Sequence, residues 1–116
     1  MFVKVKLLDN YQPGLVVSYS PEDASWVIAS SVTSPLDVIE EVERDNETHE
    51  YWSRCRFAGV SYTLADREIP NEGGKMAVLN GRVYVDNSID HAGIISPLPR
   101  GQEIRNDGEL VMVHVR

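Results

Sequence analysis

The chain has 116 residues with 18 acidic and 11 basic side chains, which give it a net charge of −7 at pH 7. A chain of this length is expected to form a single domain with its own hydrophobic core. The negative charge argues against binding to nucleic acid, because neutralising phosphates requires clustered Lys and Arg.

The only cysteine, Cys55, cannot form an internal disulfide, which favours a reducing compartment. No apolar run approaches the roughly 18 residues of a membrane-spanning helix, and the N-terminus lacks the long apolar segment of a signal peptide. We therefore expect synthesis in the cytoplasm and no membrane partner.

The first segment predicts two strands joined by a turn. Apolar residues alternate with lysines over 3–7, which is the period of a strand with one face in water. Pro13 and Gly14 suit the two central positions of a type II turn, because Pro presets φ at the first and Gly accepts a positive φ at the second. The β-branched and aromatic residues of 15–19 then predict the returning strand.

A helix over 21–31 is expected next. Ser20 is suited to the N-cap, and Pro21 to the first helical position, where its missing N–H costs nothing. Four residues also follow the spacing of one buried helical face: Ala24, Val27, Ile28 and Ser31. The alternative for this segment is a strand through 26–28.

These first 32 residues resemble a module that occurs in small phage proteins. The resemblance rests on K-V-K-L-L (4–8), Y-Q-P-G-L-V-V (11–17), P-E-D-A (21–24) and V-I-A-S-S-V (27–32). It implies a phage origin and a strand–turn–strand–helix scaffold, and it carries over no catalytic residue. Ser31 stands where the module usually has the glycine that ends its helix.

A second short helix is expected over 35–45. Ser34 and Pro35 repeat the arrangement of cap and first helical residue, and Leu36, Ile39 and Val42 are spaced for one face. The polar run 45–48 favours a turn after it. The alternative is a single helix that continues to Arg56.

The remainder predicts β-structure. Aromatic and β-branched residues return over 50–64, where Gly59 suggests a bulge, and the polar stretch 65–75 predicts a loop. Asn80-Gly81 between two apolar runs predicts a hairpin from 76 to 85 with a type I′ turn. A long loop-rich segment follows over 86–106, with a short strand at 94–95, and residues 110–115 close the chain as a strand.

The sum is six or seven strands with one or two short helices, which predicts a β-rich α+β fold built as a small sandwich or partial barrel. We expect one domain over 1–116. It would comprise the N-terminal module (1–33), an acidic helix or loop (34–50) and a β-rich body (51–116).

Seven acidic side chains lie close together in the sequence: Asp37, Glu40, Glu41, Glu43, Asp45, Glu47 and Glu50. Their spacing does not fit the calcium loop of an EF-hand. The favoured interpretation is a solvated helix face. A surface for a basic partner, a DNA-mimic surface and a cation site are the alternatives.

Two other groups could carry chemistry. Asp86, Asp90 and His91 could meet around a cation or act as base and orienting group, although an ordinary polar loop is favoured. Cys55 lies between two arginines that could lower the pKa of its thiol. In a strand those arginines would point to the opposite face, so a buried structural thiol is favoured.

Two further patterns lead to no site. The Gly73-Gly74-Lys75 run lacks the first glycine and the hydroxyl residue of a phosphate-binding loop. Four aromatic residues could form a stacking platform for bases, but with this net charge they are expected in the core and in strand pairs: Trp52, Tyr51, Tyr62 and Tyr84. The sequence therefore predicts no catalytic, cofactor-binding or metal-binding residue.

The leading functional hypothesis is a non-enzymatic phage virion protein, either a capsid decoration or cement subunit or a head-completion subunit. Its expected partners are a capsid or other virion protein and further copies of itself. The residues expected at contacts are Gly93, Ile94, Ile95, Pro97, Leu98 and Pro99 of the long loop and Glu40, Glu41 and Glu43 of the acidic segment. The alternatives are an acidic inhibitor of a host protein and a small hydrolase that uses Asp86, Asp90 and His91.

Overall fold

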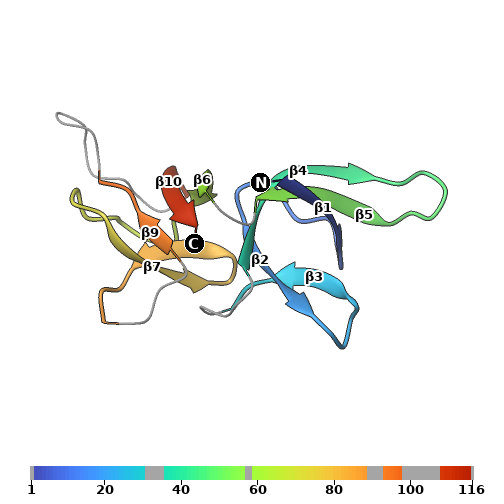
Figure 1. Cartoon of the computed structure of the whole chain (residues 1–116), viewed down its shortest axis with the longest axis horizontal. Coiled ribbons are helices and arrows are strands. Elements are labelled where there is room, and N and C mark those ends of the chain that lie inside the picture. Colours follow the sequence, from blue (N-terminus) through green and yellow to red (C-terminus); the bar gives the residue numbers. More distant parts are fainter. Residues whose placement is uncertain (1, 31–35, 57–58, 89–92, 98–107, 116) are drawn as a thin grey trace.

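The computed structural model describes residues 2–30, 36–56, 59–88, 93–97 and 108–115 (Figure 1). These residues form ten strands and no helix, in an elongated molecule of 48 × 26 × 23 Å. The expected β-rich fold of sandwich or partial-barrel type is confirmed, and its helices are not. The described part of the chain accordingly contains no helix that could cross a membrane.

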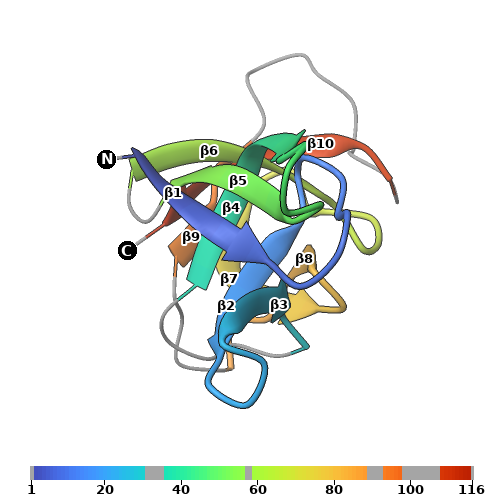
Figure 2. The same cartoon turned by 90° about the vertical axis from the view of Figure 1, so that its right-hand side faces the viewer.

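The first five strands close into a barrel in the order β1-β3-β2-β4-β5 (Figure 2). Strand β1 closes it by pairing antiparallel with β5 along its whole length and parallel with β3 at one end. The strands are β1 (Phe2–Leu7), β2 (Val16–Ser20), β3 (Ser25–Ile28), β4 (Leu36–Arg44) and β5 (Tyr51–Arg56).

The last five strands form a second sheet in the order β6-β10-β9-β7-β8. A bridge between Ala65 and Val83 joins the chain after β6 to the edge strand β8, so this sheet curls toward closure. The strands are β6 (Gly59–Leu64), β7 (Gly74–Leu79), β8 (Arg82–Val85), β9 (Gly93–Ile95) and β10 (Leu110–Val115).

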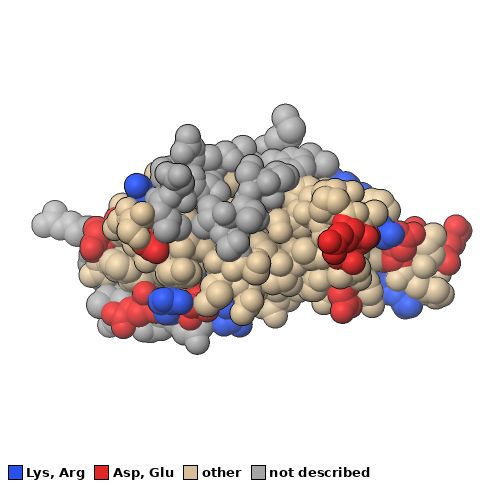
Figure 3. All heavy atoms as spheres, turned by 90° about the horizontal axis from the view of Figure 1, so that it is seen from below, with Lys and Arg blue, Asp and Glu red and all other residues tan. Residues whose placement is uncertain are grey.

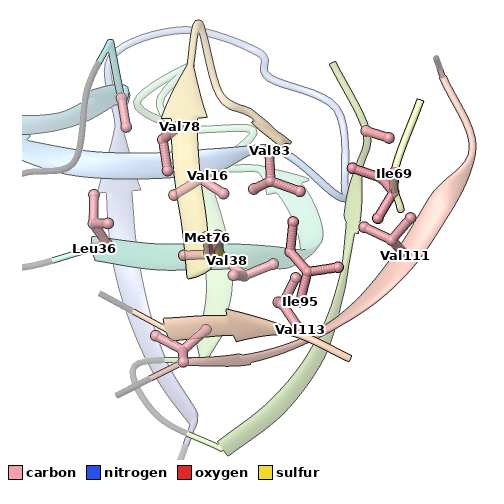
Figure 4. Packing of buried hydrophobic residues seen from close by; sticks show 13 residues of the cluster. Val16, Leu36, Val38, Ile69, Met76, Val78, Val83, Ile95, Val111 and Val113 are labelled. Atoms are coloured by element: carbon pink, nitrogen blue, oxygen red, sulfur yellow. The ribbon is translucent and has the colours of Figure 1, made fainter. Parts of the chain in front are cut away.

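Strands β2 and β4 are buried on both faces where they begin, and these first residues connect the two sheets. Val16 and Val38 point outward from the barrel into a large apolar cluster shared with the second sheet, whereas Val17 and Ile39 point into the barrel. Figure 4 shows this shared cluster. Its buried members are Val16, Ala29, Leu36, Val38, Ala65, Ile69, Met76, Val78, Val83, Ile95, Val111, Val113 and Val115.

Backbone hydrogen bonds at two glycines reinforce this contact. The Gly14 N–H donates to the carbonyl of Ile39, and the Gly14 carbonyl accepts from Leu64 of the second sheet at 3.0 Å. The Gly81 N–H donates to the carbonyl of Ala29, and its carbonyl accepts from Val16 at 2.8 Å. Both glycines have positive φ, as their predicted turns require.

The helix expected over 21–31 is wrong, and the alternative strand is correct. The Ser20 hydroxyl accepts from the N–H of Asp23, as an N-cap would, but the turn ends at Ala24 with a φ of 48°. Strand β3 follows immediately. Capping bonds of this kind also occur in isolated turns, so the cap signal alone does not specify a helix. Ser31 lies outside the described residues.

The helix expected over 35–45 is also wrong, as is the longer helix to residue 56. Strands β4 and β5 form a hairpin instead, and a bulge shifts their register between Ile39 and Glu41. The extra residue lets Ile39 and Val42 face the same barrel interior although they are three apart. The bulge therefore gives the buried residues of this strand the spacing that is typical of one face of a helix.

The predicted turns have the expected geometry. Asp45 accepts hydrogen bonds from the N–H groups of Glu47 and Thr48, which closes the turn between β4 and β5. Asn80 and Gly81 have φ values of 50° and 79°, as a type I′ hairpin requires. Gly59, expected at a bulge, begins β6 in regular pairing with Val115.

Candidate interaction surface

The outer face of β6, β10 and β9 is apolar and exposed. Its apolar side chains are between 37% and 59% exposed, and cross-strand pairing places them side by side: Met112 opposite Tyr62, and His114 between Val60 and Ile94. We call this surface the apolar face. It consists of Val60, Tyr62, Ile94, Leu110, Met112 and His114.

Alternation along the strands explains why these residues face outward. Val111 and Val113 of β10 fill the shared cluster, so Leu110 and Met112 must point to the other side of the sheet. An antiparallel sheet with one face in water usually carries polar residues there. A contiguous exposed apolar patch on a folded domain is typical of a protein interaction site.

Charged side chains of both signs gather at the β4–β5 hairpin, which forms one end of the molecule (Figure 3). Two of its carboxylates pair with lysines of β1: the exposed Glu43 with Lys4, and the half-buried Glu50 with Lys6 at 3.0 Å. An open hollow of about 720 Å³ lies here, lined by residues of both signs and by Trp52. Solvent-accessible ion pairs contribute little to stability, so we interpret this end as a solvated surface.

The seven acidic residues do not form one face, because their strand is buried at its start and exposed at its end. Asp37 is fully buried, and Glu40 is half-buried, accepting a hydrogen bond from the Ser61 hydroxyl at 2.7 Å. Glu41 and Glu43 are exposed. The solvated helix face is therefore wrong in its secondary structure and in its first residues. No group of three His, Cys, Asp or Glu residues is placed to hold a metal within the described segments.

Asp37 is a buried carboxyl group, whereas the sequence analysis placed it in a solvated acidic segment. It lies opposite Val17, a residue of the barrel core, and directly opposite residues share a face. Neither carboxylate oxygen has a hydrogen-bond partner in the described structure. Burial raises the pKa of Asp37 to about 7. The available signal was its position within an otherwise apolar run of four residues.

Cys55 is fully buried inside the barrel, as favoured from the sequence. Desolvation by burial raises the pKa of its thiol to about 12, helped by the charges of Asp37 and Glu40 and opposed by the Ser53 hydroxyl 3.2 Å away. The thiolate is the nucleophile in cysteine chemistry, so this thiol is poorly suited to catalysis at neutral pH.

The expected contact residues of the long loop fall into three groups. Gly93 and Ile95 are buried in β9, and Ile95 belongs to the shared core. Ile94 lies on the apolar face, and Pro97 is exposed. Leu98 and Pro99 lie outside the described residues.

The remaining candidates do not come together as sites. Asp86 accepts hydrogen bonds from the N–H and hydroxyl of Ser88, which lower its pKa and close a turn. Asp90 and His91 lie outside the described residues. Lys75 lies in β7, where its N–H donates to Asn87, so the loop expected over 65–75 ends earlier.

The aromatic residues occupy separate surfaces. Tyr51 packs against the barrel core, Tyr62 lies on the apolar face, and the Tyr84 ring is covered by the Arg67 guanidinium at 3.9 Å. They therefore form no common stacking platform.

Comparisons with protein-family models, curated proteins and solved structures find no match to this chain.

Proposed function

We propose that this chain is a non-enzymatic structural subunit of a phage virion, a capsid decoration or cement subunit or a head-completion part. The observation that carries the proposal is the apolar face, which offers a surface for another protein rather than a pocket for a substrate. The phage-like pattern of the first 32 residues supports the context. In this proposal the protein is made in the host cytoplasm, resides in the virion and binds neither nucleic acid nor membrane.

The size of the apolar face fits this role. The largest exposed apolar patches of monomeric proteins cover about 300–600 Å², and six adjoining side chains with more than a third of each exposed are of that order. A stable interface buries about 800 Å² per partner, with an apolar centre and a polar rim. The apolar face can therefore supply the centre of one such interface.

The test is whether purified virions contain the chain, and in how many copies. Shells that carry it should resist heat or chelators better than shells without it, because a ligand that binds only the assembled state stabilises that state. Tyr62→Glu should reduce its incorporation, whereas Tyr19→Glu, at an exposed tyrosine of the barrel, should not. Virions without the chain would contradict the proposal.

An inhibitor of a basic host protein is the second candidate. It is favoured by the exposed carboxylates of the β4–β5 hairpin, which extends away from strands β6, β9 and β10 along the molecule (Figure 1). Charge reversal at Glu41 and Glu47 should then abolish binding to the host protein, and added salt should weaken binding by the unaltered chain. Unchanged binding by that double variant would eliminate this candidate.

A further inference from the structure

We propose that the partner covering the apolar face is a second copy of this chain, which packs face to face about a two-fold axis near Met112. This inference deepens the proposed function, because it names the neighbour that the apolar face buries. In the proposed virion, the shell would then be contacted by another surface of the dimer.

Charge favours a second copy as the occupant. The chain carries a net charge of −7, so two copies repel unless they meet where carboxylates are absent. None of the six residues of the apolar face is acidic, and the nearest acid along the chain is Glu109 at its rim. In the described structure, the basic side chains at this face are His114 and the adjacent Lys75, and both pair with Ile94. The face therefore carries too little charge to select a strongly acidic or a strongly basic partner.

The strand geometry suits a symmetric contact. Strand β10 lies between β6 and β9, and Met112 is the middle residue of its outward row, between Leu110 and His114. A two-fold axis there would place β10 of one copy over β10 of the other, so both copies would use the same residues. Sheets that pack face to face lie about 10 Å apart with interdigitating side chains, which the apolar face can provide.

The buried area is sufficient for a dimer. Each copy would contribute the apolar face and its rim, which together give roughly 1,000 Å² or more in total, the lower limit for a specific interface. The residues with the largest exposed surface are Tyr62 and Leu110, at 57% and 59%. Because tyrosine is enriched among residues that dominate interface energies, Tyr62 is the position to test.

The first experiment is sedimentation equilibrium of the whole chain and two variants. The unaltered chain should dimerise, and Tyr62→Glu should raise the dissociation constant at least about tenfold, because it buries a carboxylate in each half of the interface. Tyr19→Glu is the matched control, since Tyr19 is 46% exposed on the barrel, and it should leave the constant unchanged. Circular dichroism should show that both variants remain folded.

The second experiment traps the contact. Met112→Cys should give a covalent dimer with a short bis-maleimide, because the two-fold axis brings the two thiols within reach of such a linker across sheets about 10 Å apart, while the buried Cys55 stays unreactive. Leu79→Cys, at an exposed apolar position outside the face, should form no covalent dimer under the same conditions.

The outcomes separate this inference from the proposed function. A monomeric parent chain, or a Tyr62→Glu variant that dimerises normally, overturns the inference. Slow labelling of Met112→Cys in a monomer would mean that residues of the same chain cover the face, and this also overturns it. If the monomer binds shells through Tyr62, only the inference fails, whereas a dimer that is absent from virions contradicts only the proposed function.

Discussion

The barrel and the second sheet distribute polarity in opposite ways. The barrel interior holds Asp37, Ser53 and Cys55 beside its apolar residues, and its outer surface carries the charged hairpin. The second sheet has a mainly apolar core of valine, isoleucine and methionine, in which Thr63 is a buried neutral hydroxyl without a hydrogen-bond partner in the described structure, and its outer face is also apolar. The barrel thus has a charged outer surface and a buried carboxyl group inside, whereas the second sheet buries only neutral groups and has an outer face suited to contact with a protein.

The two regions nevertheless depend on one core. Val16 and Val38 of the barrel pack against Met76 and Ile95 of the sheet in a single cluster. Because they share this cluster, we expect the barrel and the second sheet to unfold together. A substitution can nevertheless be made on either side of the cluster. The following predictions test whether the two regions unfold together and whether their interiors differ as described.

The largest effect is expected for Ile95→Ala, which removes a fully buried side chain on the sheet side of the shared core. Such truncations cost about 2–5 kcal/mol of stability. Both tryptophans, Trp26 and Trp52, lie in barrel strands, so their fluorescence reports on the barrel. The midpoints of denaturation by fluorescence and by circular dichroism should fall equally. A lowered circular dichroism midpoint with unchanged fluorescence would show that the barrel unfolds independently.

The next largest effect is a dependence of stability on pH, caused by Asp37 in the barrel interior. Burial raises the pKa of Asp37 to about 7, so the folded state keeps a proton that the unfolded state loses near pH 4. Stability should therefore fall as pH rises from about 4 to about 7, by up to about 2–3 kcal/mol between pH 5 and 7. Chemical denaturation at several pH values measures this slope.

Asp37→Asn should abolish that slope, because the amide does not titrate. Asp45→Asn is the matched control: hydrogen bonds from Thr48 and Glu47 lower the pKa of Asp45, so it titrates below this range and its loss should preserve the slope. A flat profile in the parent chain would indicate that Asp37 is ionised in the folded state.

A smaller effect is expected where the β7–β8 turn meets the barrel. Gly81→Val should cost roughly 1 kcal/mol or more, because a β-branched residue resists positive φ. A Cβ at Gly81 would also lie 3.1–3.3 Å from Ile28, Leu15 and Val16. Gly108→Val is the control, since Gly108 has a φ of 81° and no atom within 4 Å of an added Cβ. Equal losses of melting temperature would exclude a contribution from the contact with the barrel.

The smallest effect tests closure of the barrel. Cys55 should react slowly with a maleimide in the native protein and fast after denaturation, because the thiol is fully buried and its pKa is raised to about 12. The rate follows from absorbance or mass measurements. Rapid labelling of the native chain near pH 7 would show that the barrel opens readily.

The turns could be predicted from the sequence, but the side of the sheet to which each strand residue points could not. Asn80-Gly81 and Pro13-Gly14 specify their turns through φ requirements that few other residue pairs satisfy. The bulge at Glu40 was hidden, because an extra residue in a strand produces the same spacing as one helical turn. The turn after Ser20 uses the bond of a helix cap without a helix.

The candidate surface shows a similar limit. Ile94 was among the expected contact residues, but Leu110 and Met112 were not. Residues 110–115 are almost continuously apolar, a pattern typical of strands buried on both faces. Only the position of β10 over the shared cluster reveals which of its faces is left exposed by the described residues.

The dual burial of β2 and β4 has a consequence for synthesis. The barrel can close only after Tyr51–Arg56 has left the ribosome, since β5 pairs with β1. Val16, Leu36 and Val38 then face solvent on the barrel exterior until the second half of the chain emerges. At about 5–20 residues per second, making the next 60 or so residues takes roughly 3–12 s. During that interval the nascent chain carries an uncovered apolar stripe, which makes it a substrate for chaperones that hold such stripes apart.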